Sequence, residues 1–134
     1  MTSASQRFAF IGVTASESSI NAVFPRWAEL LGLTDVRFEP IDVPLDSDPQ
    51  VYRTIVRDIR DDPGHRGALV TTHKVRLLAA ARDLFDDLDR YAELCNEVSC
   101  ISRRDGRLVG HAKDPITSGR ALSDLLAPDH FAET

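Results

Sequence analysis

Short apolar runs alternate with segments of helical periodicity along nearly the whole of this 134-residue chain. Residues 8–12 form an apolar run that a glycine ends, and residues 36–43 alternate apolar with polar side chains, as strands do. Between them, from Ile20 to Leu31, apolar side chains recur every three or four residues, as on one face of a helix. Strands that alternate with helices favour a mainly parallel sheet with helices on both faces.

The same alternation continues to residue 126. Pro40 and Pro44 favour an edge position for the strand over 36–43, Pro25 predicts a kink in the helix or a late start, and Gly32 is its expected end. The pattern predicts helices over 49–60 (with Val51, Ile55 and Ile59 at i+4 steps), 75–85, 89–94 and 116–126, and strands over 67–71, 97–102 and 107–110. Asp105-Gly106 predicts a hairpin turn between the last two strands. We therefore predict an α/β fold: three layers, α/β/α, with a mostly parallel mixed sheet of about six strands and a late β-hairpin.

Composition limits the class of protein. The length indicates one domain, expected over residues 1–126, with 127–134 as a linker or tail. A net charge of −5 and scattered arginines argue against nucleic acid as a partner. No apolar run approaches the ~18 residues that span a membrane, and the N-terminus lacks a signal peptide's apolar core, so we expect a cytoplasmic protein. Cys95, Cys100 and the four dispersed histidines match no zinc-site spacing, so no metal is expected.

Two charged residues follow predicted strands. Lys74 comes after the strand over 67–71 and opens a helix, and Asp114 comes after the strand over 107–110. Ligands favour the carboxyl ends of strands in open α/β sheets, where Thr71, Thr72 and His73 add hydroxyl and imidazole groups. A lysine and an aspartate there can share a proton and hold a polar ligand. A solvated surface lysine and a helix-capping aspartate explain the same residues without a ligand.

Hydroxyl groups fill the loop after the first predicted strand. Thr14, Ser16 and Ser18 precede a helix, whose free N–H groups could bind a carboxylate or another anion together with these hydroxyls. Simple N-capping of that helix is the competing interpretation. No three glycines form G-x-G-x-x-G or a P-loop, so the chain has no motif for binding a dinucleotide.

Four segments of the chain resemble, in their order and spacing, motifs of the N-terminal, substrate-binding domain of shikimate dehydrogenases and quinate/shikimate dehydrogenases. The family has Ser-x-Ser, Asn-Val-Thr-x-Pro-x-Lys, Ala-Val-Asn-Thr and Asp-Gly-x-Leu-x-Gly-x-Asn-Thr-Asp. Here these read Thr14-Ala-Ser16 (or Ser16-Glu-Ser18), Ala68-Leu-Val-Thr-Thr-His-Lys74, Glu97-Val-Ser-Cys100 and Asp105-Gly-Arg-Leu-Val-Gly-His-Ala-Lys-Asp114. The last segment is the most specific match.

The resemblance implies a role for the matched residues. Lys74 and Asp114 fall on the catalytic lysine and aspartate of the family, so Lys74 is expected to transfer the proton while Asp114 orients it and the substrate hydroxyls. Thr14 and Ser16, or Ser16 and Ser18 in the other register, are expected to bind the substrate carboxylate. Thr71, Thr72 and Ser99 lie in the matched motifs and are further candidates for binding the substrate.

The implied activity is that of the substrate-binding half of an NAD(P)-dependent oxidoreductase, acting on a secondary alcohol of a cyclic hydroxy acid such as shikimate or quinate. NADP, or NAD, is expected on a separate domain that this chain lacks. The expected partners are the small cyclic carboxylic acid and, as one option, a second copy of the chain in a homodimer.

Several positions depart from the family pattern. Ala68, Val70, Thr72, Ser99 and Ala112 stand where the family has Asn, Thr, Pro, Asn and Asn. Lost amides and a lost hydroxyl change which hydroxylated substrate a site can distinguish. A non-catalytic ligand-sensing or interaction domain that kept the fold, and an unrelated α/β domain, are the alternatives.

Overall fold

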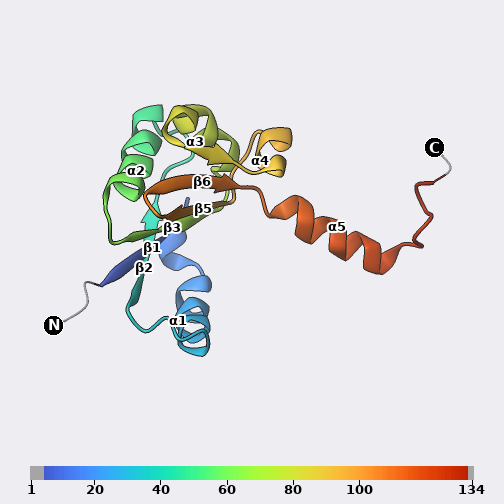
Figure 1. The fold of residues 1–134 in the computed structure, drawn as a ribbon, viewed down its shortest axis with the longest axis horizontal. Helices are drawn as coiled ribbons and strands as arrows, with labels where there is room; N and C mark the ends of the chain where they lie inside the picture. The colour runs from blue at the N-terminus through green and yellow to red at the C-terminus, as the bar shows by residue number, and fades with distance from the viewer. Residues whose placement is uncertain (1–4, 133–134) are drawn as a thin grey trace.

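The computed structural model describes residues 5–132 and has a six-stranded sheet at its centre (Figure 1). The strands are β1 (Gln6–Gly12), β2 (Val36–Asp42), β3 (His65–Val70), β4 (Asp87–Leu88), β5 (Cys100–Arg104) and β6 (Arg107–His111), in the order β2-β1-β3-β5-β6-β4. β1 is parallel to β2 and β3, and β4 is parallel to β6, whereas β5 runs antiparallel to both of its neighbours. The predicted mixed, mostly parallel sheet with a late hairpin is confirmed, and β2 lies at an edge as its prolines indicated.

Helices lie on both faces of this sheet. α1 (Ile20–Leu30), α2 (Pro49–Asp61), α3 (Lys74–Ala81), α4 (Arg90–Cys95) and α5 (Asp114–Leu125) are the α-helices, with 3₁₀ turns at Ala15–Glu17 and Arg82–Leu84. α2 and α3 pack against each other on one face, and α1 lies on the other face, beside β1 and β2 (Figure 1). No helix within residues 5–132 is long and apolar enough to cross a membrane.

The hydrophobic core lies between the sheet and the α2–α3 layer. Ala9 and Ile11 of β1, Ile101 of β5, and Leu77 and Leu78 of α3 are all fully or almost fully buried there. The face that α2 presents to this core is Tyr52, Val56 and Ile59. The expected stripe of Val51, Ile55 and Ile59 is therefore one position off for two of its members, since Val51 is exposed and Ile55 only half-buried.

Aromatic rings fix α1 to the opposite face. Phe24 of α1 stacks on Phe38 of β2 at 4.4 Å between ring centroids and on Phe8 of β1 at 5.5 Å. Pro25 lies inside the helix, which nevertheless begins at Ile20, so the expected late start is wrong. Gly32, with φ of +72°, follows the end of the helix in the left-handed conformation that glycine adopts at low cost.

The hairpin is shifted from its predicted position. β5 begins at Cys100 rather than at residue 97, because residues 97–99 are held in the connection from α4. β4 was not expected, since a two-residue strand carries no periodicity. Gly67 in β3 lies so close to β5 that a Cβ at this position would overlap the Ile101 carbonyl oxygen. The antiparallel β3–β5 pairing therefore needs glycine there.

α5 extends away from the sheet (Figure 1). It begins at Asp114, two residues earlier than predicted, and none of its residues is buried. Residues 127–132 follow it as an exposed turn, and residues 133 and 134 of the expected tail lie outside the described part.

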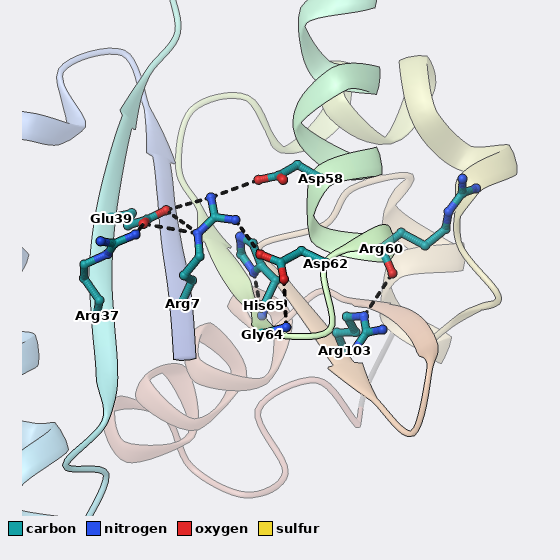
Figure 2. A network of polar contacts seen from close by, with 10 residues as sticks. Arg7, Arg37, Glu39, Asp58, Arg60, Asp62, Gly64, His65 and Arg103 are labelled. Atoms are coloured by element: carbon teal, nitrogen blue, oxygen red, sulfur yellow. Dashed lines mark hydrogen bonds and ion pairs between the residues drawn. The ribbon is translucent and has the colours of Figure 1, made fainter. Parts of the chain in front are cut away.

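A network of ion pairs joins the amino ends of the first three strands (Figure 2). The Arg7 guanidinium contacts Asp62 at 2.6 Å and both Asp58 and Glu39 at 3.0 Å. Hydrogen bonds to this guanidinium lower the pKa of Glu39, and a backbone N–H from Gly64 together with Arg7 lowers the pKa of Asp62. The network ties the β1–β2 edge to the end of α2.

Candidate functional site

The carboxyl ends of β1, β2, β3 and β6 lie at one edge of the sheet. β1, β2 and β3 are parallel, and β6 has the direction of β3 because β5, antiparallel to both, lies between them. The carboxyl ends of β3 and β6 therefore share an edge with the amino end of β5. Lys74, Asp114 and Ser99 follow or precede these three ends. This edge is where open α/β sheets usually bind ligands.

Lys74 and Asp114 form an ion pair across this edge. The Lys74 Nζ atom donates a hydrogen bond to Asp114 Oδ2, 40 residues further along the chain. Each residue is the first of its helix, and both side chains keep part of their surface open to solvent, 26% for Lys74 and 48% for Asp114. The prediction that the two residues come together is confirmed. Asp114 makes no side-chain cap of α5.

Lys74 is held in place by the buried residue before it. The His73 imidazole is 1% exposed, with Nε2 at 2.8 Å from the Val43 carbonyl oxygen and Nδ1 at 2.7 Å from the Tyr52 hydroxyl. A carbonyl only accepts hydrogen bonds, so Nε2 carries the proton, and in that tautomer Nδ1 accepts from the Tyr52 hydroxyl. The imidazole expected among the ligand-facing groups is thus part of the core and ties the start of α3 to α2 and to the end of β2.

The backbone before His73 is strained. Thr72 has φ of +59°, a left-handed conformation that costs a β-branched residue about 1 kcal/mol or more. Proline is confined to φ near −65° and could not adopt it. Thr72 stands where the family pattern has proline, so this substitution and the conformation of the loop fit each other.

Asp114 is held by a second set of bonds. The Ser99 hydroxyl accepts a hydrogen bond from the Lys113 N–H at 2.9 Å, and the Ser99 N–H donates to the His111 carbonyl at 2.8 Å. Ser99 is 8% exposed, so its hydroxyl positions the segment before Asp114 rather than meeting a ligand. The Ser99 carbonyl also accepts from the Val70 N–H, which joins this segment to β3.

A cavity of about 420 Å³ lies beside the end of β1. Among the candidates from the sequence, Thr14, Ser18, Thr71 and Thr72 line it, together with Phe10, Gly12, Val13, Ala15 and Glu17. Ser16 does not: its hydroxyl donates to Asp42 Oδ2 at 2.5 Å and its N–H donates to Oδ1 at 2.8 Å, which lowers the pKa of Asp42. The cavity thus gathers the threonine and serine hydroxyls on the loops after β1 and β3, and Thr71 and Thr72 of its lining precede Lys74 in the chain by three and two residues.

Three of the departures from the family pattern are apolar side chains inside the protein. Ala68 and Ala112 are fully buried, and Val70 is 3% exposed. Apolar side chains in the core offer no hydrogen bonds to a ligand. Sequence reasoning missed the Tyr52–His73–Val43 contacts, because a histidine next to two threonines gives no sign of facing inward. An aromatic residue on the buried face of α2 was the only available signal.

Comparison with known proteins finds the same fold in dehydrogenases. No protein-family model matches this sequence, and no curated protein matches it significantly. Among solved structures, a shikimate 5-dehydrogenase from Thermus thermophilus in complex with shikimate is 26% identical, with a TM-score of 0.66 over 92% of this chain and 45% of that chain. A shikimate 5-dehydrogenase from Listeria monocytogenes in complex with shikimate and NAD is 24% identical, with a TM-score of 0.71 over 90% and 39%.

A reductase of another substrate has this fold too. The 5-ketofructose reductase of Gluconobacter sp. strain CHM43 is 22% identical, with a TM-score of 0.71 over 92% of this chain and 42% of that chain. The chain spans less than half the length of each of these structures. The resemblance to the shikimate dehydrogenase fold, stated from sequence motifs, is confirmed.

Proposed function

We propose that this chain is the substrate-binding half of a shikimate dehydrogenase-like oxidoreductase that acts on a secondary alcohol of a small hydroxylated acid. The observation that carries the proposal is the Lys74–Asp114 ion pair at the carboxyl edge of the sheet. Two oppositely charged groups from different strands, next to a hydroxyl-lined cavity, suit proton transfer at a substrate oxygen better than they suit stability alone, because partly exposed ion pairs contribute little to folding.

Each residue then has a task. In the direction of ketone reduction, the Lys74 ammonium donates its proton to the carbonyl oxygen as that oxygen becomes a hydroxyl, and Asp114 keeps the ammonium oriented. In alcohol oxidation the same nitrogen, as the neutral amine, accepts the hydroxyl proton and becomes the ammonium. Thr14, Ser18, Thr71 and Thr72 supply hydroxyls to a polar substrate in the cavity.

The carboxyl end of β1 does not suit a dinucleotide. Gly12 ends β1 and no glycine follows it over residues 13–19, and a Cβ at Gly12 would come within 2.8 Å of Thr71 Cγ2, so side chains already fill the space where a pyrophosphate would approach the backbone. We therefore assign the binding of NADP or NAD, which the fold implies, to residues other than those at the end of β1. Hydride transfer to that cofactor is not part of the chemistry that we propose for this chain.

The lining of the cavity limits the substrate. Glu17 adds a carboxylate to its wall and Ser16 is occupied by Asp42, so a substrate carboxylate has fewer donors here than the family motif implies. Since a reductase of a keto sugar shares the fold, an uncharged polyol or keto sugar is the second substrate class.

Backbone amide NMR of the chain, titrated with shikimate, quinate, 3-dehydroshikimate and 5-ketofructose, tests the binding half of the proposal. Shifts that cluster at residues 14–18, 71–74 and 111–114 for one of these compounds are expected. Asp114→Asn should weaken that binding, and Asp124→Asn on the same helix serves as the matched control. If no compound shifts these residues, the proposed substrate class is wrong.

Turnover by the natural protein with NADP or NAD tests the catalytic half. Lys74→Met should lower kcat by about 10²–10⁴-fold, the usual contribution of a positioned acid or base, with a smaller change in KM. The non-catalytic alternative is favoured by the buried Ala68, Val70 and Ala112. It predicts binding that Lys74→Met leaves intact, with no turnover in the wild type.

A further inference from the structure

The hairpin presents a polar and basic surface on the face of the sheet opposite to α2 and α3. Along β5 and β6, Ile101, Leu108 and Gly110 are buried toward the core, while Ser102, Val109 and His111 alternate with them and point to the other side. α1 packs beside β1 and β2 on that side. A cavity of about 450 Å³ lies over the hairpin, lined by Arg66, Ser102, Arg103, Arg104, His111 and Lys113, with Cys100 and Val109 at its floor.

The cations of this cavity are largely unpaired. Arg66, Arg104 and Lys113 make no ion pair with any described residue, and no Asp or Glu in that part of the chain lines the cavity. The Arg103 side chain points to the other face, where Nε donates to the Arg60 carbonyl of α2 at 2.9 Å, so Arg103 is not among the cations that a ligand in the cavity would meet (Figure 2). Arg7 and Arg53, by contrast, are matched to carboxylates. In a chain of net charge −5, such a gathering of positive charge is unusual.

Neutral hydrogen-bonding groups complete the lining. The Ser102 hydroxyl lies 2.8 Å from His111 Nε2, and Asp89 contacts His111 Nδ1 at 3.5 Å. The hydroxyl can turn from the imidazole to a ligand oxygen, so the cavity offers donors of three kinds: guanidinium, ammonium and hydroxyl. Several cations with few anions suit a multiply charged ligand, and guanidinium groups match the geometry of phosphate oxygens.

We propose that this β5–β6 cavity binds a phosphate-bearing ligand. A single carboxylate would neutralise one of the three unpaired cations in the lining, Arg66, Arg104 and Lys113, whereas a pyrophosphate group carries enough charge and enough acceptor oxygens for more than one of them. The site does not depend on the proposed function. It lies on the open face of the hairpin, and its lining shares no residue with the cavity beside β1.

Titration of the chain with inorganic pyrophosphate, followed by amide NMR at constant ionic strength set with chloride, tests the proposal. Shifts are expected at residues 66, 102–104 and 111–113. The double variant Arg66→Gln/Arg104→Gln should weaken binding about tenfold or more, since hydrogen bonds to charged groups account for that much. Both residues are exposed, so the fold should tolerate the change. Arg57→Gln, an exposed arginine on α2, is the matched control and should bind as the wild type does.

Any one of three results would overturn the proposal. The first is that pyrophosphate leaves the hairpin amides unmoved, and the second is that the double variant and Arg57→Gln bind it equally well. The third is that a poly-glutamate peptide shifts the same amides at concentrations where pyrophosphate does not, which would assign the surface to an acidic protein segment. The shikimate titrations are judged at residues 14–18 and 71–74 and the pyrophosphate titration at residues 66 and 102–104, so a failure here is distinguishable from a failure of the proposed function.

Discussion

Tyr52→Phe removes one hydroxyl from the middle of the protein and tests the structural role of His73. The Tyr52 side chain is 1% exposed, and its hydroxyl is the sole described partner of His73 Nδ1, at 2.7 Å. The variant keeps the ring and its packing but leaves a buried acceptor without a donor. Loss of a partner in this way costs about 1–3 kcal/mol. For a domain of this size, about 2 kcal/mol corresponds to a fall in Tm of roughly 6–10 °C.

Urea unfolding of Tyr52→Phe and of Tyr91→Phe measures this cost. Tyr91 is 36% exposed and its hydroxyl makes no hydrogen bond with a described residue, so its phenylalanine variant should match the wild type within about 0.3 kcal/mol. The midpoint for Tyr52→Phe should fall at an unchanged m-value. If the two variants are equally stable, the hydroxyl does not satisfy His73 and the account of how α3 is anchored fails.

The tautomer of His73 gives a second, independent check. Long-range ¹H–¹⁵N correlation spectra should show a proton on Nε2 and a bare Nδ1, because Nε2 faces the Val43 carbonyl. A proton on Nδ1 would contradict the assignment of donor and acceptor. Weaker binding of the preferred ligand by Tyr52→Phe at 14–18 and 71–74 would show that this anchoring extends to Lys74.

Three further predictions concern stability. Gly67→Ala places a Cβ against a backbone carbonyl of β5 and should cost at least about 3 kcal/mol in urea unfolding, whereas Gly119→Ala, in open space on α5, should be neutral or stabilising. Burial lowers the pKa of His65 and of His111, so the unfolded chain binds more protons than the folded chain below pH 6.5. The free energy of unfolding should therefore fall as the pH drops from 6.5 toward the folded-state pKa values. His65→Gln should make this dependence of stability on pH less steep. Arg7→Gln leaves three carboxylates without their shared guanidinium and should cost about 1–3 kcal/mol at low salt and less at about 1 M NaCl. No loss for this variant at low salt would show that the network contributes nothing to folding.

Much of the fold was predictable because its elements are local patterns. Apolar periodicity located β1, β2, α1 and α2, and the glycine and proline positions gave the end of α1 and the edge strand. The errors fell where local pattern gives way to tertiary contact. The face of α2 was misjudged because Tyr52 is buried through its hydrogen bond to His73, 21 residues away. β5 begins late because Ser99 bonds to Lys113 and His111 across the sheet.

The candidate site was predictable only in part for the same reason. Lys74 and Asp114 could be placed together because each follows a strand, and parallel strand ends share an edge. Ser16 and Ser99 looked equivalent to Thr14 and Ser18 in the sequence, yet the first bonds to Asp42 and the second to backbone. The partner of a hydroxyl is a long-range property, which no spacing of residues reveals.

The charged residues at the amino ends of the strands contribute to stability, whereas those at the carboxyl ends form the proposed catalytic pair. At the amino ends, Arg7 lowers the pKa of Glu39 and of Asp62, which favours the folded state, and Arg7 lies beside the start of β3 whereas Lys74 follows its end. At the carboxyl ends, the charged groups form a single partly exposed pair beside a cavity. Since distant sites contribute additively, a variant that combines Arg7→Gln with Lys74→Met should show the stability loss of the first and the functional loss of the second, with no coupling between them. Coupling of more than about 0.5 kcal/mol would mean that the ion-pair network also shapes the site.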